Sequence, residues 1–415
     1  MQAGANLRVS GQRLWDSLME MAQVGPGVAG GNDRQALTDA DREGRALFRR
    51  WCEAAGMSVA VDRMGTMFAR REGAEPDLAP VYMGSHLDTQ PTGGRFDGVL
   101  GVLGGLEVVR ALDDAGVRTR RPIVLVNWTN EEGTRFAPAM LASGVFAGVH
   151  TLDYAYGRTD AQGRSFGEEL ARIGWAGDEE VGGRPIHALF ELHIEQGPIL
   201  EAEGVDVGVV THGQGLWWLE IALTGREAHT GSTPMGMRVN AGLGAARITE
   251  AVHRIAMRHQ PGAVGAVGKL DHWPNSRNVI AGRAVLTVDI RSPDAGTLAA
   301  MRAEVEAEAR AVAEGLGLGI AIEAAGHFEP VAFDAGLADV VRRAADELGL
   351  SRRDIVSGAG HDACWIARLA PTVMIFTPCE GGLSHNEAEA ITPDWARMGA
   401  DVLLRAVLEA AEIVR

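Results

Sequence analysis

The chain alternates between short apolar runs and amphipathic segments over much of its length. Residues 79–86 (APVYMGSH), 121–130 (RPIVLVNWTN) and 186–197 (IHALFELHIEQG) are largely apolar, which predicts strands covered on both faces of a parallel sheet. Residues 98–116 have the pattern of a helix that ends at Gly116. This alternation predicts an α/β fold with a mostly parallel sheet and helices on both of its faces.

The pattern changes near Gly213, where strands and helices follow one another in a different order. The expected elements are a strand at 216–225, a helix at 239–259, strands at 262–273 and 282–292, a helix at 295–316 and a strand at 317–327. The order β-α-β-β-α-β predicts a ferredoxin-like α+β domain.

The last part of the chain returns to the first pattern. Residues 354–363 and 371–378 again resemble buried strands, and a helix is expected from Pro393 onward. We therefore expect a larger α/β domain formed by residues 1–211 and 327–415, interrupted by an inserted domain formed by residues 212–326.

Composition narrows the possible partners of the chain. Hydrophobic residues make up 46% of its 415 residues and charged residues 23%, as in globular proteins. The net charge of −16 argues against nucleic acid or an anionic membrane surface as a partner. Residues 1–25 have the pattern of an amphipathic helix instead of a signal peptide. No apolar run approaches the roughly 20 residues that span a bilayer.

Cysteine and lysine usage narrow the chemistry. Cys52, Cys364 and Cys379 are odd in number and widely spaced, so no disulfide framework is expected, and the cytoplasm is the expected location. Lys269 is the only lysine. No glycine-rich loop or paired cysteine adjoins it, which argues against a phosphate-binding loop, Schiff-base chemistry or a Glu-Lys-Cys amidase.

Histidines and carboxylates gather where the apolar strands end. His86 and Asp88 end the first strand, and Glu131 and Glu132 follow the second. Because ligands bind beyond the carboxyl ends of strands in open α/β sheets, we expect these side chains to lie close together. Asp88 is two residues from His86 and could hold a neighbouring group in orientation. Two adjacent carboxylates at a strand end are costly unless a cation neutralises them or one is protonated.

Three further residues complete a set of candidate metal ligands. A glycine-rich loop precedes Asp97, a strand carries His193, and His385 follows the final strand. The complete candidate set is His86, Asp97, Glu132, His193 and His385. Imidazole and carboxylate ligands favour zinc, manganese, cobalt or nickel over calcium. If one carboxylate bridges, this set could hold two divalent ions about 3.5–4 Å apart.

At this point the sequence resembles a known family, the hydantoinase/carbamoylase group of M20-type metal-dependent amidohydrolases. That group includes N-carbamoyl-L-amino-acid hydrolases, β-ureidopropionases and allantoate amidohydrolases. The resemblance covers nearly the whole chain and rests on GSHLDT, GGRFDG, NEEGTRF, HIEQGP, HTGSTPM, NVIAG, DIRSPD, GAGHDA and LSHNEAE, in the family's order.

The resemblance implies a metal-peptidase-like catalytic domain with two divalent ions per subunit. By this resemblance Asp97 bridges the ions, His86 and His193 bind different ions, and Glu132 and His385 also bind different ions. Asp88 would orient a ligand, and Glu131 would act as the general base. The inserted domain is expected to form a homodimer.

The resemblance also implies residues that contact the substrate. His229 would stabilise the oxyanion, and Arg291 would bind the substrate carboxylate as a planar fork. Gln196, Asn278, Gly360 and His361 match further substrate positions of the family. His193 stands where related peptidases usually have a carboxylate, which favours ureido substrates. His229 lies in the inserted domain, so closure or a partner subunit would have to bring it to the metals.

Several alternatives remain open at this point. The expected activity is hydrolysis of N-carbamoyl-L-amino acids to amino acid, ammonia and carbon dioxide. Allantoate amidohydrolase and β-ureidopropionase are the nearest alternatives, and an M20-type aminoacylase or peptidase is more remote. Arg291 could simply pair with Asp289 or Asp294. Cys364 or Cys379 could be the nucleophile of a cysteine carbamoylase, or the chain could bind metal without catalysis. The glycines of GAGHDA and GVLGVLGG are better explained by packing than by phosphate binding.

Overall fold

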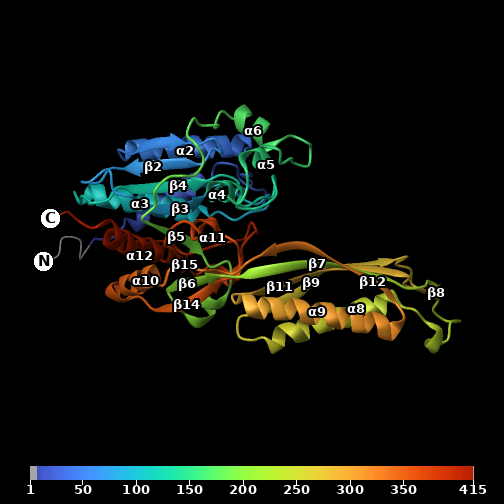
Figure 1. Ribbon diagram of the computed structural model, residues 1–415. Helices are drawn as coiled ribbons and strands as arrows, with labels where there is room; N and C mark the ends of the chain where they lie inside the picture. Colours follow the sequence, from blue (N-terminus) through green and yellow to red (C-terminus); the bar gives the residue numbers. More distant parts are fainter. Residues whose placement is uncertain (1–6, 415) are drawn as a thin grey trace. The chain divides into compact units, whose positions relative to one another are not determined.

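The computed structural model describes residues 7–414, which divide into two compact units (Figure 1). The first unit contains the described residues up to Thr211 and from Phe333 onward, and the second contains His212–Ala332. The second boundary lies a few residues after the expected position at 326/327. The reason is that the last long strand of the second unit continues to Phe328 and a short strand follows at Val331–Ala332. Residues 1–6 of the expected N-terminal helix lie outside the described residues.

The first unit is built on a large sheet whose four central strands are parallel. Its strands are β1 (Ser58–Val61), β2 (Met67–Arg71), β3 (Val81–His86), β4 (Ile123–Trp128), β5 (Ala188–Ile194), β6 (Val207–Gly213), β14 (Arg352–Ser357) and β15 (Thr372–Thr377). The short strand β13 (Val331–Ala332) pairs with the last two residues of β6, and these four residues belong to the second unit. The order is β1-β2-β4-β3-β5-β15-β6-β13, with β14 paired to β6. Strands β4, β3, β5 and β15 run parallel, while the pairs β2–β4 and β15–β6 are antiparallel. The expected mostly parallel sheet is confirmed, with antiparallel strands toward its edges.

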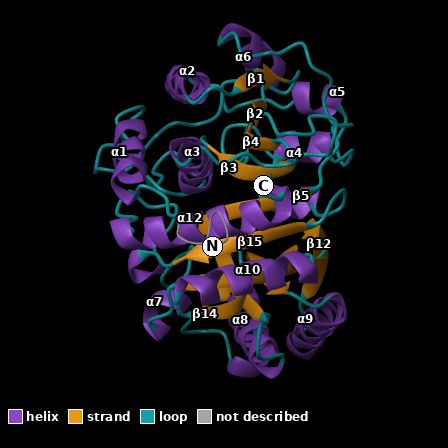
Figure 2. Ribbon diagram, turned by 90° about the vertical axis from the view of Figure 1, so that its left-hand side faces the viewer, coloured by secondary structure: helices purple, strands orange, loops and turns teal. Residues whose placement is uncertain are grey.

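Helices cover both faces of this sheet. They are α1 (Gly11–Met21), α2 (Asp39–Ala54), α3 (Val99–Asp114), α4 (Leu141–Phe146), α5 (Leu152–Tyr156), α6 (Phe166–Arg172), α7 (Ile199–Glu203), α10 (Ala335–Leu348), α11 (Asp362–Ile366) and α12 (Pro393–Ala411), with a 3-10 turn η2 at Glu380–Gly382. Helices α1, α3, α10 and α12 pack together on one face (helices in purple, Figure 2). Helix α11 packs against α4 and against β5 and β15 on the other face. Leu192 of β5 points to the first face and Glu191 to the second, which gives the alternation expected of a strand.

Helix α3 packs against the sheet at a distance that only glycine permits. A Cβ at Gly101 would lie 2.3 Å from the carbonyl oxygen of Leu192, and one at Gly105 would lie 2.5 Å from Leu125 Cδ1. Ordinary carbon contacts are no shorter than about 3.5 Å. The glycines of GVLGVLGG are therefore packing residues, and they let α3 begin directly beside the ends of β3 and β5.

The second unit has the expected ferredoxin-like order. It contains β7 (Gly215–Thr224), α8 (Ala241–Arg258), β9 (Val264–Trp273), β11 (Arg283–Ser292), α9 (Ala295–Leu316) and β12 (Gly319–Phe328). Its antiparallel sheet has the order β12-β7-β11-β9, and its own apolar core lies between this sheet and the two helices. Two short strands, β8 (Ala228–His229) and β10 (Val279–Ile280), form a separate ribbon, and Met235–Met237 form a 3-10 turn. Among residues 7–414, no helix is both long enough and apolar enough to cross a membrane.

Candidate metal centre

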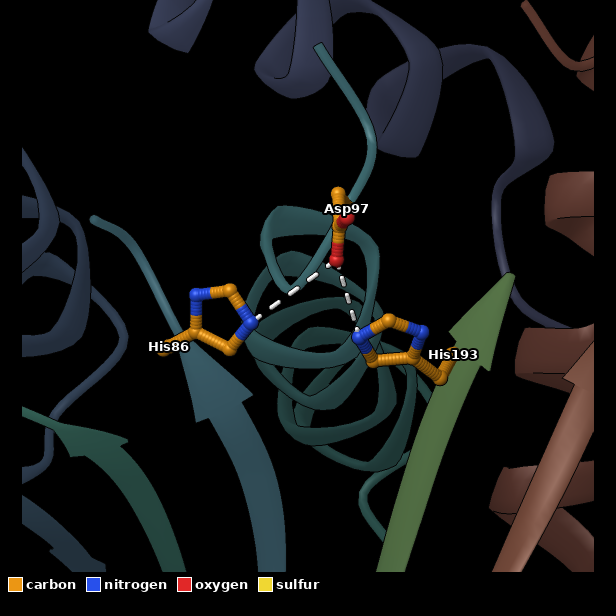
Figure 3. A group of neighbouring side chains, drawn as sticks. All are labelled: His86, Asp97 and His193. Carbon is orange, nitrogen blue, oxygen red and sulfur yellow. Dashed lines mark ion pairs between the residues drawn. The ribbon is translucent and has the colours of Figure 1, made fainter. Parts of the chain in front are cut away.

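The first unit brings three of the candidate ligands together at the carboxyl ends of neighbouring strands. His86 is the last residue of β3, His193 lies near the end of β5, and Asp97 is in the loop before α3. His193 Nε2 lies 3.2 Å from Asp97 Oδ1, and His86 Nε2 lies 3.8 Å from the same oxygen. Figure 3 shows both imidazoles pointing toward Asp97 from the two strands. The three side chains form a buried group of ligand atoms within 4.8 Å of one another.

The second oxygen of Asp97 faces another group of ligand atoms. His385 Nε2 lies 3.4 Å from Asp97 Oδ2 and 3.4 Å from Glu132 Oε2. Asp97, Glu132 and His385 again have ligand atoms within 4.8 Å of one another. The side chain of His385 is 50% exposed, so this group opens to solvent while the first is closed. The carboxylate of Asp97 therefore has one oxygen toward each group.

This geometry corrects the pairing that the family resemblance implied. His86 and His193 were expected to bind different ions, and so were Glu132 and His385. The structure places His86 with His193 and Glu132 with His385. The physical reason is strand order: β3 and β5 are adjacent and parallel, so their terminal side chains meet, whereas Glu132 follows β4 and His385 follows β15.

Backbone contacts hold the imidazoles of His86 and His193 in one orientation. Nδ1 of His86 lies 2.9 Å from the carbonyl oxygen of Asp88, and Nδ1 of His193 lies 2.9 Å from the carbonyl oxygen of Ile194. A carbonyl can only accept, so each Nδ1 carries a proton and donates it. In the neutral ring, Nε2 then keeps a lone pair, which at His193 accepts the N–H of Gly98 at 3.2 Å. This is the form of histidine that binds a metal.

Asp88 organises the turn that carries the two adjacent glutamates. Its Oδ1 accepts the N–H of Glu131 at 3.3 Å, and its Oδ2 accepts the N–H of Glu132 at 3.2 Å. Glu131 Oε2 lies 3.5 Å from His86 Nε2, and Glu132 Oε2 accepts an N–H of Gln90 at 2.6 Å. Asp88 therefore holds the backbone of Glu131 and Glu132 in place, while the side chains of these two residues contact different neighbours.

The charges of the site fit divalent cations. Burial, and then the carboxylates Asp362 and Glu132, raise the pKa of Glu131 well above its usual value. Burial followed by Asp97 does the same for Glu132. Burial lowers the pKa of His86 to about 4, so this imidazole is neutral and available as a ligand. Crowded buried carboxylates are stabilised either by taking up protons or by nearby positive charge. Divalent ions of the zinc, manganese, cobalt or nickel type would supply that charge.

The pKa of His193 is also affected by the neighbouring carboxylate of Asp97. Burial would lower its pKa, but the hydrogen bond and the charge of Asp97 outweigh burial and raise it to about 9. The proton that His193 holds beside Asp97 occupies the place that a cation would take. Metal binding at this group is therefore expected to release a proton.

Gly98 gives a test of how tightly the first group is built. Its φ is +67°, and a Cβ there would lie 2.3 Å from Cε1 and Nε2 of His86. We expect Gly98→Ala to displace the imidazole and weaken divalent metal binding by about 10–100-fold, and to destabilise the fold by about 1–2 kcal/mol. Calorimetric titration of the demetallated protein with Mn²⁺ measures the first effect, and thermal unfolding measures the second.

Gly116 offers the matched control for this substitution. Its φ is +61°, and no atom of the described residues lies within 4 Å of its hypothetical Cβ. Gly116→Ala should therefore cause a similar backbone penalty and leave Mn²⁺ affinity unchanged. Equal Mn²⁺ affinity in the two variants would show that Gly98 does not shape the metal group.

Three residues expected at the substrate lie in the first unit. Gln196 donates from Nε2 to Asp97 Oδ2 at 2.9 Å and to Ser384 Oγ at 3.1 Å, so it contacts the candidate bridging ligand. His361 is buried, its Nε2 lies 2.8 Å from Ser357 Oγ, and its ring centroid is 4.6 Å from that of His193. Gly360 is exposed beside Met140. Their contact with a substrate stays a prediction.

The other expected substrate residues lie in the second unit. His229 pairs with Val279 across the β8–β10 ribbon, next to Asn278, whose carbonyl oxygen accepts the N–H of Thr230. Nδ1 of His229 accepts two backbone N–H groups, from Gly231 at 3.0 Å and Ser232 at 3.2 Å. The proton of neutral His229 is consequently on Nε2, where it can be donated.

Arg291 has the contact that was considered as its alternative role. Its guanidinium donates to Asp289, with Nη2 2.7 Å from Oδ2 and Nε 3.0 Å from Oδ1. This pairing is a planar fork against a carboxylate. Binding of a substrate carboxylate by Arg291 stays a prediction.

Sequence reasoning gave no role to four polar residues that surround the ligands. They are Ser384 and Glu389, which contact the Asp97 loop, and Glu191 and Asp362, which are buried carboxylates behind the site. Glu191 accepts from the Ser85 hydroxyl and the Ala363 N–H, and Asp362 accepts from the Ser143 hydroxyl. Alternation along a strand could have indicated Glu191, two residues before His193.

The cysteines do not suit nucleophilic catalysis. All three are buried and free. Burial raises the pKa of Cys364 to about 12 and that of Cys379 to about 12, so each is a thiol near neutral pH. The thiolate is the reactive form of cysteine, and the cysteine-carbamoylase alternative therefore loses its support.

Comparison with known proteins identifies the family of the chain. The model of peptidase family M20/M25/M40 matches residues 82–409. The chain is 68% identical over 411 residues to an N-carbamoyl-L-amino-acid amidohydrolase of Rhizobium meliloti, covering 99% of each chain. It is 35% identical to an N-carbamoyl-L-amino acid amidohydrolase of Geobacillus stearothermophilus, covering 97% of this chain and 99% of that protein.

A solved structure supports the same relationship. A hydantoinase/carbamoylase family amidase from Burkholderia multivorans superposes with a TM-score of 0.96 at 56% identity, covering 98% of each chain. The expected fold and the resemblance to the hydantoinase/carbamoylase group are confirmed. The match over residues 82–409, which include every candidate ligand, shows that the chain belongs to peptidase family M20/M25/M40.

Proposed function

We propose that the protein is a dinuclear metal-dependent amidohydrolase that removes the carbamoyl group from N-carbamoyl-L-amino acids. The products are an amino acid, ammonia and carbon dioxide. The observation that carries the proposal is the Asp97 carboxylate, which has one oxygen toward His86 and His193 and the other toward Glu132 and His385. The 68% identity to an N-carbamoyl-L-amino-acid amidohydrolase supports the choice of substrate.

In this proposal the buried and the open ligand groups each hold one divalent ion. His86 and His193 would bind the first, Glu132 and His385 the second, and Asp97 both. When bound, the ions would lower the pKa of a water molecule toward neutrality and polarise the substrate carbonyl. Manganese, cobalt, zinc or nickel all suit this ligand set.

Glu131 is the base in the proposed reaction. It is buried beside His86 and is not needed as a member of either ligand group. It would take a proton from the attacking water and pass it to the leaving nitrogen, so the ureido C–N bond breaks with a neutral amine as product. Burial raises the pKa of Glu131 and the bound ions would lower it, and a pKa near the working pH would suit both proton transfers.

Residues of the inserted unit complete the proposal. His229 holds its proton on Nε2 because Nδ1 accepts two N–H groups, and it would donate this proton as a hydrogen bond to the developing oxyanion. Such donors often contribute about 3–4 kcal/mol. Arg291 and Asn278 of the same unit would bind the substrate carboxylate and make a further contact, respectively. Gln196, Gly360 and His361 of the first unit would make further contacts with the substrate.

We also propose a homodimer through residues 212–326 and a cytoplasmic location.

A substrate panel tests the function. The purified protein, supplied in turn with Mn²⁺, Co²⁺ or Zn²⁺, is assayed with several N-carbamoyl-L-amino acids, N-carbamoyl-β-alanine and allantoate. We expect kcat/KM to be highest for an N-carbamoyl-L-amino acid, by about 100-fold. A similar preference for allantoate or N-carbamoyl-β-alanine would favour the corresponding alternative. Loss of activity with a chelator and its persistence after thiol alkylation are the expected controls.

A further inference from the structure

Asp97 is held in place by contacts from outside its own loop. The residue lies between β3 and α3, in neither element. Yet its two oxygens face the two ligand groups, so a small rotation of Asp97 would disturb both of them at once. Whatever fixes the backbone and carboxylate of Asp97 therefore sets the geometry of the whole centre.

The buried carboxylate of Glu389 contacts the loop of Asp97 directly and also contacts Ser384. Its Oε1 accepts the N–H of Phe96 at 2.9 Å and the N–H of Asp97 at 3.1 Å. Its Oε2 lies 3.3 Å from the hydroxyl of Ser384, which also lies 2.8 Å from Asp97 Oδ2. Glu389 thus contacts the backbone of Asp97 directly and the carboxylate of Asp97 through Ser384.

The loop is shaped around that carboxylate. A Cβ at Gly94 would lie 1.9 Å from Cδ of Glu389 and 2.0 Å from its Oε1, so the chain can approach this closely only at a glycine. Glu389 itself is 1% exposed. A buried carboxylate is retained at such a place only when its hydrogen bonds compensate for lost hydration.

Glu389 also shares a segment with a ligand of the second group. His385 is four residues before Glu389, and Ser384 directly precedes His385. Gln196 donates to Ser384 Oγ at 3.1 Å, which leaves the hydroxyl proton of Ser384 for a carboxylate. The contacts therefore join the loop of Asp97 to the segment of His385.

We infer that Glu389 is a positioning residue that locks Asp97 and His385 into the arrangement needed to hold two divalent ions. This inference rests on the proposed function, because it concerns the same metal centre. Glu389 acts through Asp97, so its loss should appear first in metal affinity and only then in turnover.

Calorimetric titration of the demetallated protein with Mn²⁺ tests the inference. Glu389→Ala leaves two buried N–H groups without an acceptor, and we expect Mn²⁺ affinity to fall by about 10–100-fold. Glu389→Gln retains an oxygen that can accept both N–H groups, so it should recover most of the affinity. Turnover of Glu389→Ala should rise again at saturating Mn²⁺.

Asp62 provides the matched control. It is also 1% exposed, and its Oδ1 also accepts two backbone N–H groups, from Met64 and Thr66, each at 2.9 Å. It directly follows β1, and these hydrogen bonds involve none of the candidate ligands. Asp62→Ala should lower thermal stability and leave Mn²⁺ affinity unchanged.

The outcomes separate this inference from the proposed function. Wild-type Mn²⁺ affinity in folded Glu389→Ala would overturn the positioning role. If Glu389→Ala does not fold, Ser384→Ala replaces it, with a smaller loss of affinity expected and unchanged affinity overturning the role. A wild-type protein that binds one Mn²⁺ would contradict the two-ion proposal. The ratio of Mn²⁺ affinities between the wild-type protein and Glu389→Ala would still test the positioning role of Glu389.

Discussion

Glu131→Gln is expected to reduce kcat for an N-carbamoyl-L-amino acid by about 10²–10⁴-fold, the usual contribution of a general base. The amide is close to the carboxylate in shape but cannot accept a proton near neutral pH. Glu131 Oε2 lies 3.5 Å from His86 Nε2 and within the buried part of the site. The variant should therefore keep the local packing while losing proton transfer.

Measuring the metal content distinguishes loss of proton transfer from loss of the metal centre. Neither ligand group requires Glu131, so Glu131→Gln should bind the same number of Mn²⁺ ions as the unchanged protein. Glu132→Gln is the matched comparison on the adjacent residue, since Glu132 belongs to the group of His385, and it should lose Mn²⁺ affinity. Hydrolysis by Glu131→Gln at the normal rate would disprove the role given to Glu131.

The pH dependence of the unchanged protein bears on the same residue. Burial and neighbouring carboxylates raise the pKa of Glu131, whereas bound divalent ions would lower it, and the pH at which its base form is lost follows from the balance of these effects. We attribute to Glu131 an acidic limb of the kcat profile that Glu131→Gln should lack. The limb descends as pH falls, because only the deprotonated carboxylate accepts a proton.

The position of the site was predictable because it follows from strand order and strand ends. Apolar runs that stop at His86, at Glu131 and near His193 become buried strands, and the parallel sheet brings their carboxyl ends together. Only side-chain type and place along the strand are needed for this prediction. The ferredoxin-like order of the second unit was predictable for the same reason, since its strands and helices have clear periods.

The arrangement within the site was not predictable in the same way. Which ligands share an ion depends on which strands are adjacent, and the order β4-β3-β5-β15 places His86 beside His193. Glu389 lies in a loop, and its partners Phe96 and Asp97 are nearly 300 positions earlier in the chain. No local pattern encodes a contact of that separation, so the sequence of the LSHNEAE motif does not indicate what Glu389, its last residue, contacts.

Asp97→Asn is expected to remove one ion and abolish measurable turnover. In the structure, Oδ2 accepts from Gln196 Nε2 at 2.9 Å and from the Ser384 hydroxyl at 2.8 Å. The oxygen of asparagine should therefore take the Oδ2 position, and its NH₂ group should take the Oδ1 position beside His193. An amide nitrogen is not a metal ligand, so the ion of His86 and His193 should be lost preferentially.

The number of Mn²⁺ ions bound per chain tests this expectation. Elemental analysis after Mn²⁺ loading should find one tightly bound ion in Asp97→Asn and two in the unchanged protein. Asp62→Asn, another buried carboxylate-to-amide change at an oxygen that accepts two N–H groups, should retain two ions. Asp97→Asn that retains both ions would mean that Asp97 Oδ1 is not a ligand. Since Asp97 is the residue common to both groups, the proposal of a bridged pair of ions would fail with it.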